Sequence, residues 1–363
     1  MNPRATLLLA ALPVLLALAG CQRNAEESAR RSLDRAGRAL TPGDAVAAAR
    51  EGNLQQIILF REAGLDLALP DASGETPLLA ALRSGHMNVA DNLLRGGVPA
   101  QSLPPVPPAV AAPQAAPVPD TAPPDSAPRD SSQTALGWAL ARRDLNILGL
   151  LLQGGADPNE PLSTPASEDF LQAVGHEGFA YYLRKEKNVT PLMLAAATGQ
   201  TEAVRALLAA GAKPGAQTAR HKTVAIWLAG KHGHPGIVQV LLGKSPRPED
   251  QHTRLTIRLG EQKVLLFKNG QLADSSPISS GRKGFPTPTG TFVVTNKYRH
   301  WNSTLYDDAP MPYFMRLSCS DFGLHAGALP GYPASHGCIR LPEAKAAAFF
   351  AKVDVGTLVE IVD

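Results

Sequence analysis

The sequence has little cysteine, few aromatic residues and no block of one charge. Only 3 of its 363 residues are cysteines, and 5% are Phe, Trp or Tyr. Lysine and arginine exceed the acidic residues by 3 and form none of the basic runs that favour nucleic acid. No nucleic-acid partner is therefore expected. Hydrophobic residues at 44% are typical of globular domains, and 363 residues suit two domains rather than one.

An apolar run long enough to cross a bilayer is also missing. Residues 5–19 are predominantly apolar, which is short of the ~20 residues that a spanning helix needs but suits the core of a signal peptide. The run ends in Leu-Ala-Gly-Cys21, which resembles the cleavage box of bacterial lipoproteins. The resemblance implies a signal peptide over residues 1–21 and a lipid on Cys21. An ordinary signal peptide or a mitochondrial presequence is the alternative.

The residue after Cys21 bears on localisation. Gln22 rather than Asp stands there, and in the sorting pattern of such lipoproteins this points to the outer membrane. We therefore expect a lipid-anchored protein that faces the periplasm. Residues 22–42, charged and Ala-rich, are expected to be a tether.

A helix-pair pattern recurs along the first two thirds of the chain. The clearest copy, NVTPLMLAAATGQTEAVRALLAAGAKPG at 188–215, has Thr-Pro-Leu before a short helix, then a glycine turn and a second helix. Four further copies share this frame, and Thr190 and Thr223 are 33 residues apart. The pattern resembles ankyrin repeats, whose period is about 33 residues. The resemblance implies an all-α solenoid over residues 43–246 that binds a protein ligand on its concave face.

Two insertions lengthen the spacing between copies. Thr76 and Thr134 are 58 residues apart and Thr134 and Thr190 are 56 apart, so the excess over the period is 25 and 23 residues. The first insertion, at about 101–131, is Pro-rich, and we expect it to loop out, extended and solvated, while the flanking repeats stack. The second, at about 160–187, has helical spacing, and we expect it to be ordered against the array.

After Pro246 the apolar pattern changes to alternation. Residues 255–259 alternate apolar and polar, KVLLFK follows as a strand, and Asn269-Gly270 is a hairpin turn signal. We therefore expect a mainly-β domain over residues 251–363. It should contain one helix at 343–352 and end in the strand TLVEIV.

The stretch HAGALPGYPASHGCIRLP, residues 325–342, carries two histidines and a cysteine. A nucleophilic Cys338 needs a neutral histidine to take its proton. His325 lies 13 residues earlier on what should be an adjacent strand or loop, so it is the candidate base. His336 is expected to orient the loop.

The other residues near Cys338 suit acyl chemistry. Gly337 lets the backbone approach an acyl group, and the amides of Gly337 and Cys338 are candidate oxyanion donors. Ser335 can hydrogen-bond a histidine ring and fix its tautomer. Arg340 is a fixed cation suited to bidentate binding of a carboxylate.

Three alternatives remain open on these residues alone. Cys319, His325, His336 and Cys338 are a possible zinc set, although ligands at 336 and 338 are closer than the usual gap. A disulfide between Cys319 and Cys338 would suit an oxidising compartment, either as a structural bond or as a redox latch. The same side chains could also simply pack in a β domain.

A resemblance to a known family favours the role of Cys338 as a nucleophile over these three alternatives. SHGCIRLP, preceded in order by GFPTPTGTF, MPYFMRL and LHAG, is similar to the L,D-transpeptidase (YkuD) catalytic domain. It implies that no metal or organic cofactor is needed and that the partners are peptidoglycan stem peptides. The implied roles are nucleophile for Cys338, general base for His325, shaping of the base network and oxyanion site for Ser335, His336 and Gly337, and substrate orientation for Arg340.

The implied reaction belongs to cell wall biogenesis and the control of cell shape. Cys338 would be acylated by a tetrapeptide stem, release D-alanine and pass the acyl group to an amine, forming 3,3 cross-links or attaching protein to the wall. Transfer to water would instead make an L,D-carboxypeptidase. A non-catalytic ankyrin scaffold, anchored to the wall through its β domain, is the alternative from another class.

Overall fold

The computed structural model describes residues 23–100, 133–303, 305, 308–318 and 322–363. The chain divides into two compact units, one ending at Gly175 and the other running from His176 to Asp363. Three predicted features lie outside the described residues: the signal peptide with Cys21, the Pro-rich insertion at about 101–131, and Cys319. Among the helices that are described, none is long and apolar enough to cross a membrane.

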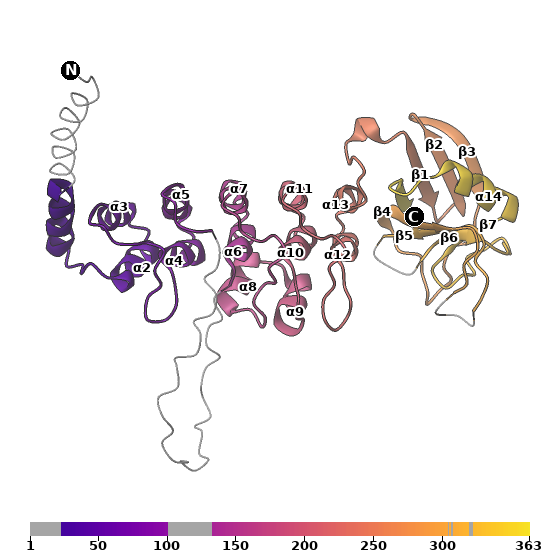
Figure 1. The fold of residues 1–363 in the computed structure, drawn as a ribbon. Coiled ribbons are helices and arrows are strands. Elements are labelled where there is room, and N and C mark those ends of the chain that lie inside the picture. The colour runs from indigo at the N-terminus through magenta and orange to yellow at the C-terminus, as the bar shows by residue number, and fades with distance from the viewer. Residues whose placement is uncertain (1–22, 101–132, 304, 306–307, 319–321) are drawn as a thin grey trace, which may run out of the picture. The chain divides into compact units, whose positions relative to one another are not determined.

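The first unit is built from short helix pairs (Figure 1). Its helices are α2 (Pro42–Arg50), α3 (Leu54–Glu62), α4 (Pro77–Ser84), α5 (Met87–Arg95), α6 (Ala135–Ala141), α7 (Leu145–Gln153) and α8 (Glu168–Val174). In one row α2 packs on α4 and α4 on α6; in the other, α3 packs on α5 and α5 on α7. The predicted helix pairs are therefore confirmed in this unit.

Threonine begins the first helix of most pairs. Thr41, Thr76, Thr134 and Thr190 are N-caps whose hydroxyl oxygens accept a hydrogen bond from the amide three residues on. Proline directly follows three of these threonines. The cap satisfies an amide that has no partner within the helix, and proline has no amide to satisfy. The Thr-Pro sequence thus sets where these helices begin.

Residues 23–35, within the predicted tether, form a helix. Its Ala29 and Leu33 are buried, and Arg30 donates a hydrogen bond to the carbonyl of Ala63 at 3.4 Å. Because Ala29 and Leu33 are four residues apart, they form a small apolar stripe on one side of the helix. This part of the expected tether therefore packs onto the first helix pair.

The second insertion is ordered, as expected. It contains α8 in the first unit and α9 (Glu177–Lys185) in the second. Ser167 caps α8, and the ring of Phe170 on α8 meets Trp138 of α6 edge to face, with the ring centroids 5.1 Å apart. Its apolar residues therefore have partners in the array.

The second unit continues with two helix pairs and then the β domain. The helices are α10 (Pro191–Ala197), α11 (Thr201–Ala209), α12 (Ala225–Lys231) and α13 (Pro235–Leu241), and α13 packs against β4. The buried side-chain amide of Gln239 on α13 donates to the carbonyl of Gly356 at 2.8 Å and to Oε1 of Gln251 at 2.9 Å. These bonds tie the last helix pair to the β domain.

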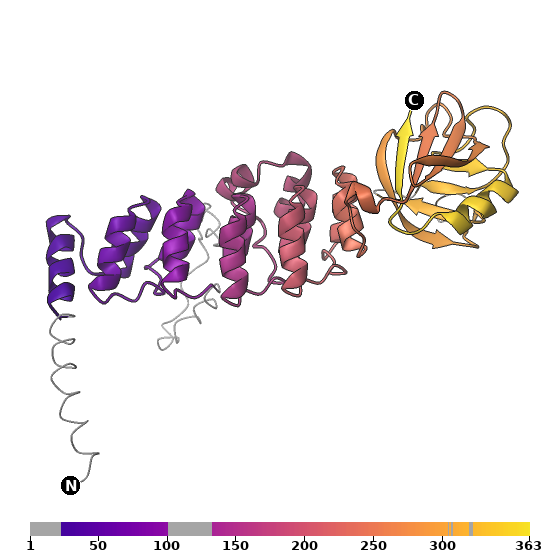
Figure 2. The ribbon, with the colours of Figure 1, turned by 90° about the horizontal axis from the view of Figure 1, so that it is seen from above.

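The β domain contains an eight-stranded sheet in the order β3-β2-β1-β8-β4-β5-β6-β7 (Figures 1 and 2). The strands are β1 (Thr253–Arg258), β2 (Lys263–Lys268), β3 (Gln271–Pro277), β4 (Gly290–Tyr298), β5 (Phe314–Leu317), β6 (Gly323–Ala326), β7 (Ile339–Leu341) and β8 (Leu358–Val362). β1 runs parallel to β8 and β6 to β7, while the other neighbours are antiparallel.

The predicted local features of this domain are confirmed. The helix α14 (Glu343–Lys352) has the predicted bounds, and its Ala346 and Phe349 enter the core. Asn269 and Gly270 both have positive φ, as a tight hairpin turn between β2 and β3 requires. α14 packs on β6, which positions the strand that carries His325.

Candidate active site

His325 is a buried histidine on β6, with a relative exposure of 7%. Its Nδ1 lies 2.8 Å from the carbonyl oxygen of Ala326. A carbonyl can only accept, so Nδ1 carries the proton and Nε2 is left as the basic nitrogen. Burial lowers the pKa of His325 to about 4; the bond to Ala326 opposes this shift, and the charge of Arg340 adds to it. The imidazole is therefore neutral at pH 7, with Nε2 unprotonated.

Cys338 directly precedes β7, the strand that pairs with β6 and its His325. The two strands are parallel, with His325 opposite Arg340. Cys338 is half-buried and comes directly before the first residue of β7, Ile339. The pairing of β6 with β7 therefore brings together the two segments that carry the predicted nucleophile and base.

Ser335 closes the turn that leads into β7. It is buried, and its hydroxyl donates to the carbonyl of Cys338 at 2.5 Å and accepts from the amide of Gly337 at 3.1 Å. The prediction that Ser335 fixes the histidine tautomer is therefore corrected, because its hydroxyl is used within its own turn. The carbonyl of Ala326 holds the His325 tautomer instead.

Gly337 has a conformation that only glycine adopts readily, with φ of +112°. Its carbonyl accepts from the hydroxyl of Thr287 at 2.8 Å, and its amide donates to Ser335. The prediction that this amide is an oxyanion donor is therefore wrong, because the amide donates its hydrogen bond to Ser335 within the turn. Gly337 serves the site by shaping the backbone before Cys338.

His336 is exposed and belongs to a different set of contacts. Its Nε2 accepts a hydrogen bond from Nη2 of Arg282 at 2.7 Å, and its ring meets Phe285 edge to face with centroids 4.9 Å apart. The backbone amide of Arg282 also donates to the carbonyl of Ser335. His336 therefore joins the turn to residues 282–285, in keeping with the orienting role expected of it.

Arg340 is a half-buried cation beside the base. Its aliphatic part lies over Gly327, where a Cβ would come within 3.0 Å of its Cδ. In the described part of the chain its guanidinium forms no ion pair with a carboxylate. Its donors can thus serve the carboxylate of a bound molecule, as the sequence predicts.

Two contributors were missed by the sequence analysis. Thr287 lies in GFPTPTGTF, and its hydroxyl accepts from the amide of Gly281 and donates to Gly337, which links two segments of the site. Ala326 acts through its backbone alone, so its residue type carries no signal. For Thr287, the sequence did offer a clue, because GFPTPTGTF is one of the segments that resemble the L,D-transpeptidase catalytic domain. Cys319, which the disulfide and the full zinc set would need, lies outside the described residues.

Two models of known protein families match parts of the chain. Residues 252–361 match the L,D-transpeptidase catalytic domain (YkuD). Residues 170–252 match a model of three ankyrin repeats. The chain therefore has a helical region that matches ankyrin repeats, followed by a β-rich domain that matches the L,D-transpeptidase catalytic domain, and the predicted fold class is confirmed.

Individual relatives cover short parts of the chain. L,D-transpeptidase 2 of Mycobacterium tuberculosis (strain CDC 1551 / Oshkosh) is 29% identical over 118 residues, which is 28% of this chain and 29% of that protein. The 60 kDa lysophospholipase of Mus musculus is 48% identical over 58 residues, or 16% of this chain and 10% of that protein. The chain thus spans less than a third of the length of these curated relatives.

Solved L,D-transpeptidases are also similar to this chain. The structure from Enterococcus faecium is 27% identical, covers 33% of this chain and 53% of its own, and has a TM-score of 0.30. One from Mycobacterium tuberculosis H37Rv is 23% identical, covers 31% of this chain and 58% of its own, and also has a TM-score of 0.30.

Proposed function

We propose that this chain is a cysteine-dependent L,D-transpeptidase that acts on the tetrapeptide stems of peptidoglycan. The observation that carries the proposal is the neutral, buried His325 with an unprotonated Nε2, on the strand that pairs with the strand directly after Cys338. The match of residues 252–361 to the catalytic domain supports the substrate class.

The proposed first step is acylation. Nε2 of His325 takes the proton of the Cys338 thiol as the sulfur attacks the carbonyl of the third stem residue. When the tetrahedral intermediate collapses, the bond to the terminal D-alanine breaks and the departing amine receives the proton from His325. A thioester on Cys338 remains, and the base is neutral again. Arg340 would orient the stem by binding a carboxylate.

The proposed second step releases the acyl group. An incoming amine loses its proton to His325 and attacks the thioester, and Cys338 leaves as a thiol. An amine on a neighbouring stem gives a 3,3 cross-link, and an amine on a protein attaches that protein to the wall. Both outcomes use the same two side chains, so the acceptor is chosen by its access to the thioester.

The remaining parts of the chain suggest where this chemistry takes place. A lipid on Cys21 would hold the protein at the outer membrane on its periplasmic side. The ankyrin repeats would bind a protein that positions the enzyme, since such repeats present an extended binding surface. The wall and its remodelling machinery would then be within reach of the β domain.

Intact mass after incubation with a carbapenem tests the cysteine mechanism. A soluble form that starts after Cys21 is reduced and treated, beside Cys338→Ala and His325→Gln. One adduct on the starting chain, none on Cys338→Ala, and acylation slowed about 100-fold in His325→Gln are expected, as for loss of a general base. Muropeptide products then identify the acceptor. Folded wild-type protein that forms no adduct would contradict the proposal.

A further inference from the structure

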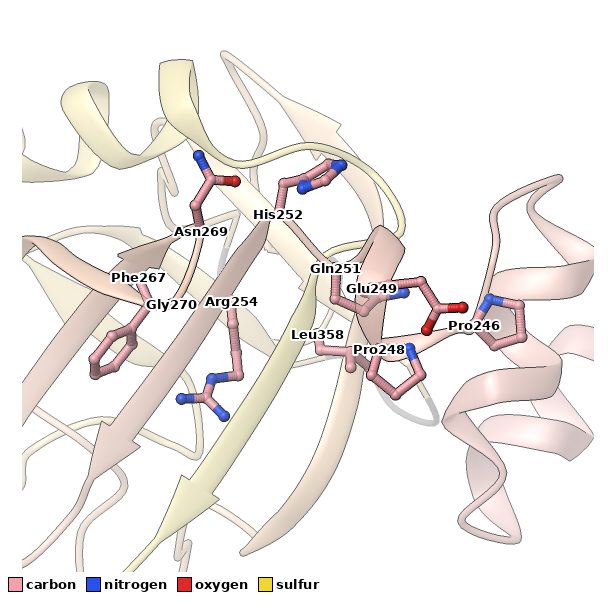
Figure 3. A pocket seen from close by; sticks show the side chains of 10 residues that line it. All are labelled: Pro246, Pro248, Glu249, Gln251, His252, Arg254, Phe267, Asn269, Gly270 and Leu358. Atoms are coloured by element: carbon pink, nitrogen blue, oxygen red, sulfur yellow. The ribbon is translucent and has the colours of Figure 1, made fainter.

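A cavity of about 560 Å³ opens on the β domain, next to the segment that joins it to the last helix pair (Figure 3). Its floor comes from strands β1, β2 and β8, and its other side from residues 246–252. In the sheet, β4 and β5 separate β8 from β6, which carries His325. The cavity is therefore distinct from the Cys338 site, and its size is that of a small-ligand pocket.

The floor is a row of three side chains on neighbouring strands. Arg254 is opposite Phe267 in the β1–β2 pairing and opposite Leu358 in the β1–β8 pairing. Residues that pair in this way point to the same side of the sheet, and Figure 3 shows Arg254 and Phe267 side by side. The row thus places one cation between two apolar surfaces.

Arg254 is prepared to bind an anion. Its guanidinium carbon lies 5.1 Å from the centroid of the Phe267 ring, so the aromatic face holds the side chain in place. It is exposed, and within the described residues it takes part in no ion pair. A held guanidinium with open N–H groups matches the two oxygens of a carboxylate.

The opposite side of the cavity is held in place by hydrogen bonds. The side-chain amide of Gln251 donates to the carbonyl of Ser245 at 2.6 Å and accepts from Gln239. The amide of Asn269 donates to the carbonyl of His252 at 2.8 Å, which ties the β2–β3 turn to the start of β1. The pocket is therefore preformed, and a ligand need not order it.

The chemistry of the lining selects the ligand. Pro246 and Pro248 add apolar surface to that of Phe267 and Leu358. The acidic Glu249 has an oxygen 3.8 Å from Nε of Arg247, and the same nitrogen lies 3.3 Å from Asp250. A carboxylate that carries small apolar groups fits this combination, and the end of a peptide stem, with its alanine methyl and its free carboxylate, has both features.

We propose that this pocket binds a second peptidoglycan stem through Arg254 and so holds the wall polymer while Cys338 acts on another stem. The proposal rests on the proposed function for its choice of peptide. It gives the segment at 246–252 a role in substrate binding.

Hydrogen exchange with added disaccharide-tetrapeptide tests this assignment, because it reports the pocket and the Cys338 site separately. The soluble chain that starts after Cys21 is used with Cys338→Ala, so that nothing turns over. We expect protection of residues 246–254 and 263–270, and Arg254→Gln should need about tenfold more ligand for the same protection. Arg258→Gln is the matched control, since Arg258 lies four residues along β1 and pairs with Glu261.

Each other outcome would overturn the proposal. Equal protection of Arg254→Gln and Arg258→Gln would show that Arg254 binds no carboxylate there. Equal protection by the disaccharide without its peptide would assign the pocket to the glycan. Stronger protection by an acidic peptide made only of L-residues would assign it to a protein partner. Carbapenem acylation of the unaltered chain tests the proposed function separately, so failure of one is distinguishable from failure of the other.

Discussion

At the scale of the residue, His325 couples the chemistry of the site to the stability of the domain. Its pKa is about 4 in the fold, because the ring is buried, against about 6.5 in an unfolded chain. Between these two values the unfolded chain binds a proton that the folded one does not. The folded state is therefore favoured at pH 7 and loses this advantage as the pH falls toward 4.

This difference predicts a pH-dependent loss of stability. The free energy of unfolding of the β domain should fall by about 3 kcal/mol between pH 7 and pH 4 on account of His325 alone. In His325→Asn that part of the slope should vanish, since asparagine does not titrate. Hydrogen exchange of peptides from β6 and β7 in urea measures the opening of this domain. Identical slopes in the two proteins would contradict the assigned burial effect.

The residue types in SHGC are enough to propose the participants but not to assign every hydrogen bond. Cys338 and His325 could be paired from the sequence because their chemistry requires a partner and their separation allows adjacent strands. The hydroxyl of Ser335 has several acceptors within reach, and only the folded turn decides that it meets Cys338. Backbone groups such as the Ala326 carbonyl are present at every position, so no sequence pattern singles them out.

At the scale of the element, α14 is fastened to the sheet through one carboxylate. Asp274 on β3 accepts from Lys345 at 2.6 Å and from Lys352 at 2.8 Å, and both lysines lie on α14. These hydrogen bonds lower the pKa of Asp274 to about 2. The contribution of ionised Asp274 to the free energy of unfolding is thus complete above about pH 4 and is lost as the pH falls through 2.

Replacing Asp274 should loosen the helix. Asp274→Asn is expected to lower the free energy of unfolding at pH 7 by about 1 kcal/mol, a modest figure because the lysine side chains remain 41% and 40% exposed to solvent. The loss should show first as faster hydrogen exchange in α14. Lys345→Gln and Lys352→Gln, alone and combined with Asp274→Asn, complete a double-mutant cycle. Full additivity across that cycle would mean that the pairs contribute no coupling energy.

Helices and turns that depend on neighbouring residues were predicted from the sequence, whereas the pairing of distant strands was not. The bounds of α14 and the Asn269-Gly270 turn follow from helical spacing and turn chemistry. The parallel pairing of β1 with β8 joins residues about a hundred positions apart, and alternation alone does not choose a partner strand. Residues 23–35 carry only two buried apolar residues, which is too weak a pattern to predict their packing.

At the scale of the whole molecule, the division into two units separates the catalytic domain from most of the repeats. The second unit holds the entire β domain together with the last helix pair, whose Gln239 binds the carbonyl of Gly356. The core beside Cys338 is made of residues from 255 onward. We therefore expect the proposed acylation of Cys338 to depend on no described residue before His176.

Removal of residues 23–175 should accordingly leave the acylation rate of Cys338 by a carbapenem within about twofold of that of the longer chain. The matched variant is Gln239→Ala in the longer chain, which keeps every repeat but leaves two acceptors without their donor and should destabilise the second unit by about 1–3 kcal/mol. The acylation rate is measured by intact mass in samples quenched at successive times. Each rate is divided by the folded fraction, which circular dichroism gives, before the proteins are compared. A shortened protein that is folded yet no longer acylated would mean that the first unit completes the site, and the repeats would then be part of the enzyme rather than its means of placement.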